Sequence, residues 1–381
     1  MKGHLKEVLR GHEAFWRREE MDRPLMLVTH YSLSRDGVPP MRLRLPDGSY
    51  LPDGVMLTPE MLDPQAIHAD FGPDSEGSAF GRTPGASPEA TGGPPAMAGD
   101  VFLPAAPYPV VPWMEAILQC PIQVSLTSHS MWAEPLGRPW SARTARLHLD
   151  RRWLNRLAEF THYLVASSGG RYLVATTLMR GVSDMLNATM GDEAFCLALH
   201  DSPDTVHRLA DSAVEIFLEA ARTQTDYIGR FHGGTCTLFG IWAPGSSIRT
   251  QDDAAVLISP RHYARFILPR QERIASAFDY SVIHLHSANL HIVDLICDSS
   301  ITAVQVTIDP QPFGPPVRDL IGTFLRILKK KPLMIDGPFT RAELEHALGT
   351  LPAKGLFISA RMQTEEDRAK TWGEDGRNDP H

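Results

Sequence analysis

The sequence predicts an α/β fold in the form of a single (β/α)8 barrel, or TIM barrel, over residues 1–365. Short apolar runs of β type alternate with helical patterns from residue 150 onward. Strands that are separated by helices pair in parallel through right-handed crossovers, and eight such strands in a chain of 381 residues suit a closed barrel. A doubly wound open sheet is the alternative, but no glycine-rich nucleotide loop follows the first strand.

The first two predicted elements precede a long insertion. Apolar residues at helical spacing predict an amphipathic helix over residues 4–20, and the apolar run 24–30 predicts a buried first strand. Residues 31–112 are rich in proline and glycine, so we expect an insertion that lies over the catalytic face as a lid or binding surface. Residues 366–381 form a polar, charged tail that should fray.

The rest of the chain supplies the remaining elements of the predicted barrel. Further strands are expected at 122–126, 171–175, 234–239, 280–284, 303–307, 332–336 and 355–359. Helical patterns lie at 151–166, 203–224, 260–278, 315–329 and 340–349. Ser202-Pro203 and Ser259-Pro260 each suit an N-cap residue followed by proline at the first helical position.

The composition argues against several classes of partner. A hydrophobic fraction of 43% and a charged fraction of 22% are those of a soluble globular protein. The net charge of -8, without a basic stripe, argues against nucleic acid or a membrane surface. No apolar run approaches the roughly 20 residues that cross a bilayer, and the charged N-terminus is unlike a signal peptide. Scattered cysteines without a CxxC motif indicate a reduced, cytoplasmic protein. The oligomeric state, with a homodimer among the options, stays open.

The most informative segment is His284-Leu-His286, which directly follows the β-type run 280–283. Residues at positions i and i+2 of an extended segment point to the same side, so both imidazoles can converge on one ion or anion. Polar groups at the C-terminal ends of strands are also where α/β barrels keep their chemistry. A histidine-rich surface turn is the alternative.

Polar residues also end four other predicted strands. His30 suits a metal ligand or a general base, and Tyr31 suits a hydrogen bond to a substrate, although a capping histidine in a turn is equally consistent. Asp309 and Asp336 follow neighbouring strands and complete a His/Asp constellation, with a plain turn role as the alternative. Arg361, after the last strand, can bind a carboxylate or phosphate.

The loop after the predicted strand 234–239 carries a tryptophan and two adjacent carboxylates. Trp242 can shape a pocket, and Asp252 or Asp253 can supply an acid or base. Carboxylates at the strand ends of a barrel commonly face the site. A solvated turn that leads into the next helix is the alternative.

Several segments resemble the uroporphyrinogen decarboxylase superfamily, which includes porphyrin decarboxylases and corrinoid-linked methyltransferases. The resemblance covers nearly the whole chain and rests on the order and spacing of its motifs. The motifs are His12-Glu-Ala-Phe-Trp16 with Asp22-Arg-Pro24, Met179-Arg-Gly-Val-Ser-Asp184 with Met190-Gly191 and Asp201-Ser-Pro-Asp204, Ile258-Ser-Pro260 with Phe266-Ile-Leu-Pro269, and His284-Leu-His286.

Departures from the family pattern favour its methyltransferase branch. The haem-pathway decarboxylases carry paired arginines after the first strand, which hold substrate carboxylates, and the corresponding segment 26–35 lacks them. The methyltransferases bind zinc through His-x-Cys and a distant cysteine. Here His284-Leu-His286 keeps the spacing with histidine, an acceptable ligand, but the last strand ends without a cysteine. The third ligand would be Asp309, Asp336 or a histidine of the insertion.

The resemblance also implies substrate contacts in the segment after the predicted strand 171–175. Asp184 and Asn187 stand where the family places substrate-contacting residues, with a helix N-cap as the competing role for Asp184. Arg180 is the most natural anion anchor of this segment.

The leading hypothesis is a methyltransferase that acts on a small-molecule substrate. Zinc or another divalent ion at the histidine pair would hold or polarise the substrate, and Asp252 or Asp253 would manage protons. The resemblance adds a corrinoid protein as the partner. A cofactor-free decarboxylase of a smaller acid, anchored by Arg180 or Arg361, is the first alternative, and a non-catalytic ligand-binding barrel is the second.

Overall fold

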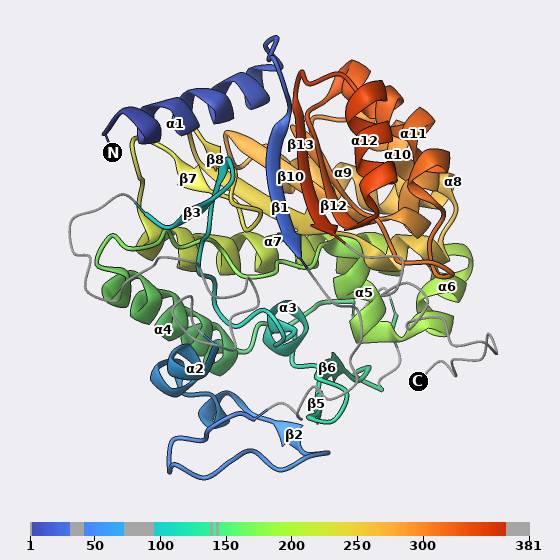
Figure 1. Cartoon of the computed structure of the whole chain (residues 1–381). Helices are drawn as coiled ribbons and strands as arrows, with labels where there is room; N and C mark the ends of the chain where they lie inside the picture. Colours follow the sequence, from blue (N-terminus) through green and yellow to red (C-terminus); the bar gives the residue numbers. More distant parts are fainter. Residues whose placement is uncertain (1, 31–41, 72–94, 138–139, 142–144, 363–381) are drawn as a thin grey trace, which may run out of the picture.

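The computed structural model describes residues 2–30, 42–71, 95–137, 140–141 and 145–362. A parallel sheet of six strands lies at the centre of this α/β structure (Figure 1), in the order β1-β13-β12-β11-β10-β9. Its strands are β1 (Leu25–His30), β9 (Ser247–Gln251), β10 (Tyr280–His286), β11 (Ala303–Thr307), β12 (Leu333–Phe339) and β13 (Leu356–Met362). The predicted α/β class is confirmed, and every strand of this sheet except β9 was predicted.

The predicted helices are present, with some changes at their ends. They are α1 (Lys2–Arg17), α4 (Arg151–Ser168), α7 (Pro203–Ile228), α8 (Pro260–His262), the π-helical segment η3 (Tyr263–Ile267), α9 (Leu268–Ala275), α11 (Val317–Lys330) and α12 (Arg341–Thr350). The remaining helices are α2 (Pro64–Phe71), α3 (Trp113–Ile117), α5 (Val182–Met190), α6 (Asp192–Asp201), α10 (Val293–Asp298) and the 3-10 turns η1 (Pro59–Met61), η2 (Asp253–Leu257) and η4 (Ser287–Ile292). Ser259 caps α8 with its hydroxyl, whereas the Ser202 side chain makes no capping bond to α7. Among these helices, none combines the length and the apolar character that crossing a bilayer requires.

Three predicted strands are not part of the parallel sheet. Residues 171–175 form only an isolated bridge, from Val174 to Ala105. Residues 234–239 contain the two-residue strand β7 (Thr235–Cys236), which pairs antiparallel with β8 (Trp242–Ala243). The segment 122–126 contributes β5 (Ile122–Ser125) to a separate antiparallel sheet with β2 (Met56–Leu57) and β6 (Ser130–Ala133). The third small sheet pairs β3 (Met97–Ala98) with β4 (Val101–Phe102).

The strand β9 was missed because its sequence, Ser-Ile-Arg-Thr-Gln, is mostly polar. All five of its residues are nevertheless buried. Sequence patterns detect strands through apolar side chains, so a buried strand with polar side chains gives no such signal. Two of its polar residues, Arg249 and Gln251, belong to the candidate site described below.

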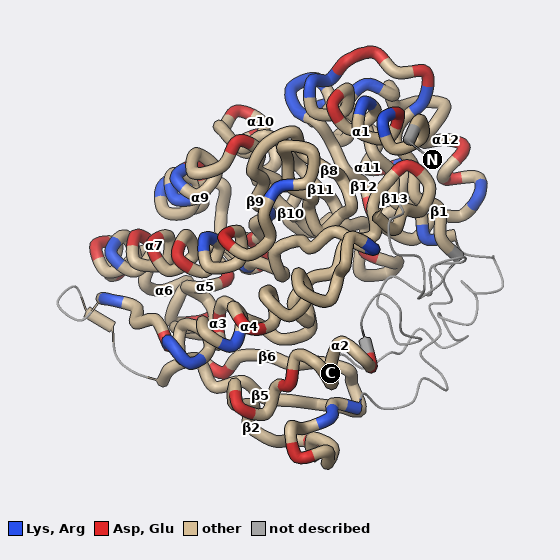
Figure 2. Tube along the Cα trace, turned by 90° about the vertical axis from the view of Figure 1, so that its left-hand side faces the viewer, with Lys and Arg blue, Asp and Glu red and all other residues tan. Residues whose placement is uncertain are grey.

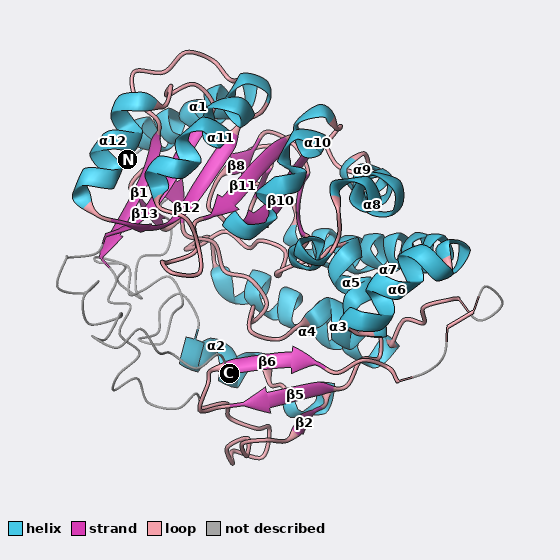
Figure 3. Ribbon diagram, turned by 90° about the vertical axis from the view of Figure 1, so that its right-hand side faces the viewer, coloured by secondary structure: helices cyan, strands magenta, loops and turns pink. Residues whose placement is uncertain are grey.

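The β2-β5-β6 sheet forms a second layer of the molecule. Helices α3, α4, α5 and α7 lie between it and the parallel sheet in the views of Figures 1 and 3. The predicted insertion 31–112 contributes α2 and β2 to this layer, while its segments 31–41 and 72–94 lie outside the described residues. The predicted tail 366–381 also lies outside them.

The two faces of the parallel sheet are packed differently. On one face, side chains such as Ile283 and Leu285 of β10 join a large apolar cluster with residues of the surrounding helices. On the other face, a smaller apolar cluster occupies the N-terminal part of the strands and packs against Phe15 and Trp16 of α1. Its sheet residues are Leu25, Val282, Ala303, Met334 and Phe357.

Polar residues continue this second face toward the C-terminal ends of the strands. Because side chains alternate along a strand, a residue two positions after a member of the smaller cluster lies on the same face. On four strands these positions hold polar side chains, namely His284, Gln305, Asp336 and Ser359. The chemistry-bearing residues therefore gather at the C-terminal half of one face of the sheet.

The outer helices carry charges of both signs (Figure 2). Along α7 and α9, for example, Arg270 and Arg273 each lie 3.0 Å from Asp211, and Arg273 lies 2.6 Å from Glu215. Surface pairs of this kind contribute about 0.2–1 kcal/mol each. They help to hold α9 against α7.

Candidate metal site

Three side chains at the C-terminal ends of β9 and β10 face one another. His284 and His286 occupy alternate positions of β10, and Asp253 begins η2 directly after β9. His284 lies opposite Gln251 in the β9–β10 register, which brings the residues after β9 beside the histidine pair. The ligand atoms of the three residues all lie within 4.8 Å of one another. We call this group the His2Asp cluster.

The histidine rings present the same nitrogen to the aspartate. The Nε2 atoms of His284 and His286 each lie 4.0 Å from Oδ1 of Asp253. The two rings are perpendicular, with their centroids 4.9 Å apart. A separation of 4.0 Å is too long for a hydrogen bond. Zinc bonds nitrogen and oxygen at about 2.0–2.2 Å, so small side-chain rotations would bring the three atoms around one ion.

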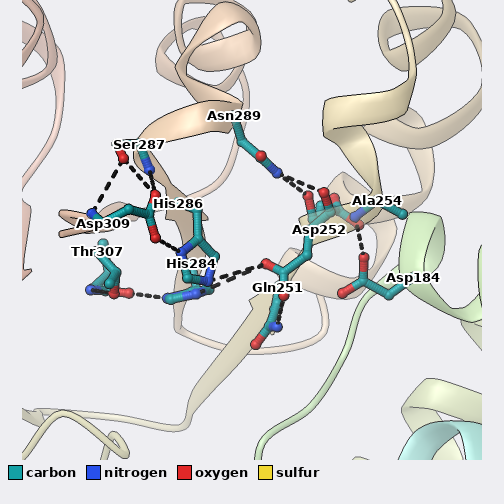
Figure 4. Close-up of polar contacts among 12 residues, drawn as sticks. Asp184, Gln251, Asp252, Ala254, His284, His286, Ser287, Asn289, Thr307 and Asp309 are labelled. Atoms are coloured by element: carbon teal, nitrogen blue, oxygen red, sulfur yellow. Dashed lines mark hydrogen bonds and ion pairs between the residues drawn. The ribbon is translucent and has the colours of Figure 1, made fainter. Parts of the chain in front are cut away.

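Polar partners fix the orientation of both rings (Figure 4). Nδ1 of His284 contacts Oε1 of Gln305, whose amide in turn donates to Thr307 over 3.1 Å. Nδ1 of His286 lies 2.6 Å from Oδ1 of Asp309. When each Nδ1–H donates to its oxygen, each Nε2 keeps a free lone pair that points at Asp253. Such partners orient metal-binding histidines in known metal sites.

Asp253 has one oxygen that is bonded and one that is free. Its Oδ2 accepts a hydrogen bond from the Gln251 amide. Its Oδ1 is buried and has no hydrogen-bond partner among the described residues. A buried carboxylate oxygen without a partner is costly, and a cation between Oδ1 and the two Nε2 atoms would satisfy it. The donor set therefore fits a divalent ion.

The protonation of His284 agrees with this fit. Burial, with help from the nearby Arg249 and His286, holds the pKa of His284 well below its ordinary value. The neutral ring is the form that binds a metal. The hydrogen bond to Asp309 raises the pKa of His286. Burial opposes the ionisation of Asp309, but hydrogen bonds from His286 and Ser287 outweigh it and lower its pKa.

Two imidazoles and one carboxylate are a donor set of zinc and of iron(II) enzymes. Three protein ligands leave a coordination position open to a substrate or water, whereas structural zinc sites use four. The cluster therefore has the composition of a site that binds and polarises a ligand.

Asp252, next to Asp253, faces away from the cluster. It is fully buried and accepts hydrogen bonds from Ser183 N (3.1 Å), Ser183 Oγ (2.7 Å), Tyr263 Oη (2.8 Å) and Gln271 Nε2 (2.7 Å). Burial raises its pKa to about 6 against the effect of these bonds. The expected acid–base role does not fit a carboxylate whose oxygens are fully occupied. Asp252 instead joins α5 and α9 to the end of β9.

Asp184 supports the turn that carries Asp253. Its Oδ1 accepts a hydrogen bond of 2.7 Å from the backbone of Ala254, and its Oδ2 is buried without a partner (Figure 4). Burial is the first cause that raises its pKa well above the ordinary value, followed by the charges of Asp253 and Asp252. Asp184 thus lies beside the cluster rather than at an N-cap, since Gly181 holds that position of α5.

The predicted anion anchors are each bound to a carboxylate. Arg180 donates to the buried Glu115 over 2.8 Å. Arg361 lies 3.1 Å from Asp336, which also accepts a hydrogen bond of 2.8 Å from Ser359. Asp336 is therefore not a ligand of the His2Asp cluster, and neither is Asp309, which holds His286 from behind.

Two further predicted site residues, Trp242 and Asn187, make their contacts away from the cluster. Trp242 is buried in a separate apolar cluster with Val8 and Phe102, and its indole donates to the Phe231 carbonyl. The Asn187 amide donates to Asp192 over 2.9 Å. Tyr31 and the side chain of His30 lie outside the described residues.

Three residues of the site were not predicted. Gln305 holds His284, Gln251 holds Asp253, and Arg249 lies buried beside them. Arg249 and Gln251 belong to β9, the strand without an apolar signal. The signal that could have found Gln305 is its place in Ala-Val-Gln-Val-Thr, where a polar residue interrupts a buried strand.

Comparison of the sequence with protein-family models gives no match, and comparison with curated proteins gives none either. The proposal of a metal site below therefore rests on the geometry of the site.

Proposed function

We propose that this protein is a metal-dependent enzyme in which Asp253, His284 and His286 hold zinc or another divalent ion. The observation that carries the proposal is the buried, unpartnered Oδ1 of Asp253, which faces both histidine Nε2 atoms at 4.0 Å. The hydrogen bonds behind both rings support it further, because they pre-orient the ligands.

We assign methyl transfer to or from a small substrate as its reaction. This part of the proposal comes from the resemblance to the uroporphyrinogen decarboxylase superfamily, as does a corrinoid protein as the methyl carrier. A bound zinc ion lowers the pKa of a ligand and so makes an acceptor group a better nucleophile. The chain's own residues position this chemistry, since Gln305 and Asp309 hold the imidazoles and Gln251 holds the carboxylate.

The proposal takes the parallel sheet as six strands of a closed (β/α)8 barrel. Contacts beyond the edge strands support closure. Next to β1, the backbone N–H of Asp100 donates to the Met26 carbonyl. The segment that follows reaches Ala105, which pairs in parallel with Val174. In a closed barrel the His2Asp cluster would stand at the C-terminal mouth, where such enzymes keep their active sites.

A second candidate reaction is the decarboxylation of a small acid. Arg249 favours it, because this buried cation lies beside the cluster without a carboxylate partner among the described residues. The anchors expected for this reaction, Arg180 and Arg361, are both engaged in ion pairs. A substrate carboxylate would therefore have to bind Arg249, which has no carboxylate partner among the described residues.

Elemental analysis of the protein after incubation with zinc tests whether the His2Asp cluster binds a metal ion. We expect one divalent ion per wild-type chain and none in Asp253→Asn or His286→Ala, because each change removes a ligand. Asp336→Asn serves as the matched control and should keep the ion, since Asp336 pairs with Arg361 instead. The proposal would be refuted if the wild type bound no metal, or if all four proteins bound the same amount of metal.

Product analysis separates the two reactions. Zinc-loaded protein is incubated with a methylated corrinoid and a panel of thiols, and demethylation of the corrinoid is followed by its absorbance. Corrinoid demethylation that requires Asp253 supports methyl transfer. Release of CO2 from small acids without any corrinoid turnover would replace methyl transfer with decarboxylation.

A further inference from the structure

Arg249 is a buried cation that the proposed metal site does not use. Its side chain lies in the interior with 4% of its surface exposed. Its Nη2 donates to Oε1 of Gln251 over 2.7 Å. Its Nε and Nη1 are buried and have no hydrogen-bond partner among the described residues. Two of the three guanidinium nitrogens therefore lack an acceptor.

The guanidinium stays charged in this position. Burial lowers the pKa of Arg249 to about 10, which is still far above neutral pH. A buried charge without a partner costs several kcal/mol, so arginines in protein interiors are normally paired with carboxylates. Within the described residues, no carboxylate oxygen lies close enough to Arg249 to form an ion pair.

The nearby carboxylates do not resolve this imbalance. Asp253 and Asp184 act on Arg249 from a distance. Asp253 is a ligand of the proposed ion, so a divalent cation would take up its negative charge. The site would then hold a divalent cation and a guanidinium against few negative charges. Such a site attracts an anion.

Aromatic stacking ties Arg249 to the His2Asp cluster. The guanidinium carbon of Arg249 lies 5.5 Å from the centre of the Phe239 ring. The same Phe239 ring stacks on His284, with centroids 6.5 Å apart and an angle of 16° between the planes. Phe239 thus holds the cation and a proposed metal ligand side by side. This cation–π contact with Phe239 leaves Nε and Nη1 without a hydrogen-bond acceptor among the described residues.

We propose that Arg249 is the carboxylate-binding subsite of this protein and that its substrate is a small carboxylic acid. The carboxylate would accept hydrogen bonds from Nε and Nη1, while the reacting end of the acid would lie toward the His2Asp cluster. The subsite itself rests on Arg249 alone, and its role as a substrate anchor rests on the proposed function. The assignment holds for either reaction, because both need the substrate to be fixed beside the ion.

Thermal unfolding in the presence of small carboxylates tests the subsite. Sodium acetate, propionate and butyrate are compared with sodium chloride at equal ionic strength, first with metal-depleted protein. We expect the carboxylates to raise the unfolding temperature of the wild type beyond the effect of chloride, because a ligand that binds only the folded state stabilises it. Equal effects of chloride and the carboxylates would mean an adventitious ion only, and would overturn the proposal.

Substitutions of Arg249 then locate the effect. In Arg249→Met the carboxylate effect should vanish, while the unfolding temperature without anions stays equal or rises because an unpaired buried charge has been removed. Arg249→Lys keeps the charge but lacks the planar set of donors, so the dissociation constant for propionate should rise at least tenfold. The matched control is Arg265→Met, since Arg265 also stacks on a phenylalanine, at 4.8 Å from Phe266, but is exposed. If the Met variant does not fold, the Lys variant decides: unchanged propionate affinity would refute the subsite.

Repeating the titration with zinc-loaded protein separates this inference from the proposed function. If the protein binds carboxylates through Arg249 but binds no zinc, the carboxylate subsite is retained and the proposal of a metal-dependent enzyme is refuted. If the protein binds zinc but its carboxylate binding is unchanged by substitution of Arg249, the metal site is retained and the carboxylate subsite is refuted.

Discussion

At the scale of the residue, two adjacent aspartates have opposite roles. Asp252 is saturated with hydrogen bonds inside the protein, and Asp253 has an oxygen free to bind an ion. The chain leaves β9 at Gln251 and enters η2 at Asp253, so the two side chains of this turn meet different surroundings. The chemical identity of the two residues is the same, and only the direction of the side chain distinguishes them.

We predict that substitution with asparagine separates the two roles. Asp252→Asn replaces an acceptor oxygen by an NH2 group that faces other donors, so the free energy of unfolding should fall by about 2–4 kcal/mol. Asp253→Asn should leave stability within about 0.5 kcal/mol of the wild type but abolish zinc binding. Urea unfolding and elemental analysis of both variants check the pair. A large loss of stability in Asp253→Asn alone would mean that the roles are exchanged.

The residues of the site were predicted only in part. His284, His286 and Asp253 were each singled out, but Asp253 as an acid or base, while the third ligand was sought at Asp309 and Asp336. Sequence spacing identifies two ligands on one strand, because the period of a strand is fixed. Sequence spacing cannot identify Asp253 as the third ligand, because Asp253 follows the neighbouring strand β9, and β9 was not predicted.

At the scale of the element, β9 explains why that assignment failed. A strand in the interior of an α/β protein is normally a run of apolar residues, and β9 instead has Arg249 and Gln251 on its site face. The polar residues of the candidate site thus remove the apolar pattern by which a buried strand is predicted, and such local conflicts are expected at functional sites. The apolar runs at 122–126, 171–175 and 234–239 were predicted as barrel strands because their apolar pattern is stronger than that of β9.

The same element depends on a close contact with the start of α5. The backbone N–H of Gly181 donates to the Gln251 carbonyl over 2.6 Å. A Cβ at position 181 would lie 2.3 Å from Nε2 of Gln271 and 2.6 Å from that carbonyl oxygen. Only glycine lets α5 approach the end of β9 so closely.

We predict that Gly181→Ala destabilises the protein by about 1–3 kcal/mol, because it overpacks this contact. It should also weaken zinc binding, since the end of β9 carries Asp253. The matched control is Gly322→Ala in α11, where a Cβ meets nothing within 4 Å. That change should stabilise the protein by about 0.5–1 kcal/mol through helix propensity. Thermal unfolding of both variants measures the contrast, and equal behaviour of the two would contradict the close approach.

At the scale of the whole molecule, α1 connects distant parts of the chain. The ring of His12 is fully buried, where Nε2 lies 2.8 Å from the Asp100 carbonyl and Nδ1 accepts a hydrogen bond of 2.9 Å from the Trp242 backbone. Both ring nitrogens are used by the neutral form, because Nδ1 must accept. Burial lowers the pKa of His12 from 6.5 to about 4.

This histidine should make stability depend on pH. The pKa of His12 is lower in the folded state, so its contribution is complete above the unfolded value of 6.5 and is lost as the pH falls toward 4. The wild type should lose about 2–3 kcal/mol between pH 7.5 and 4.5 relative to His12→Gln, which cannot titrate. Chemical denaturation of both proteins over this range checks the prediction, with the exposed His346→Gln as the control. Parallel curves for wild type and His12→Gln would disprove it.

The pairing of β1 with β13 has a consequence for synthesis. Leu25 lies opposite Phe357, so the first strand of the sheet finds its partner only near the end of the chain. At about 5–20 residues per second, a ribosome needs on the order of 20–60 s between the two strands. During that time β1 is an exposed edge that other nascent chains can pair with. The parallel sheet therefore cannot be completed until the last strand of the chain has been synthesised.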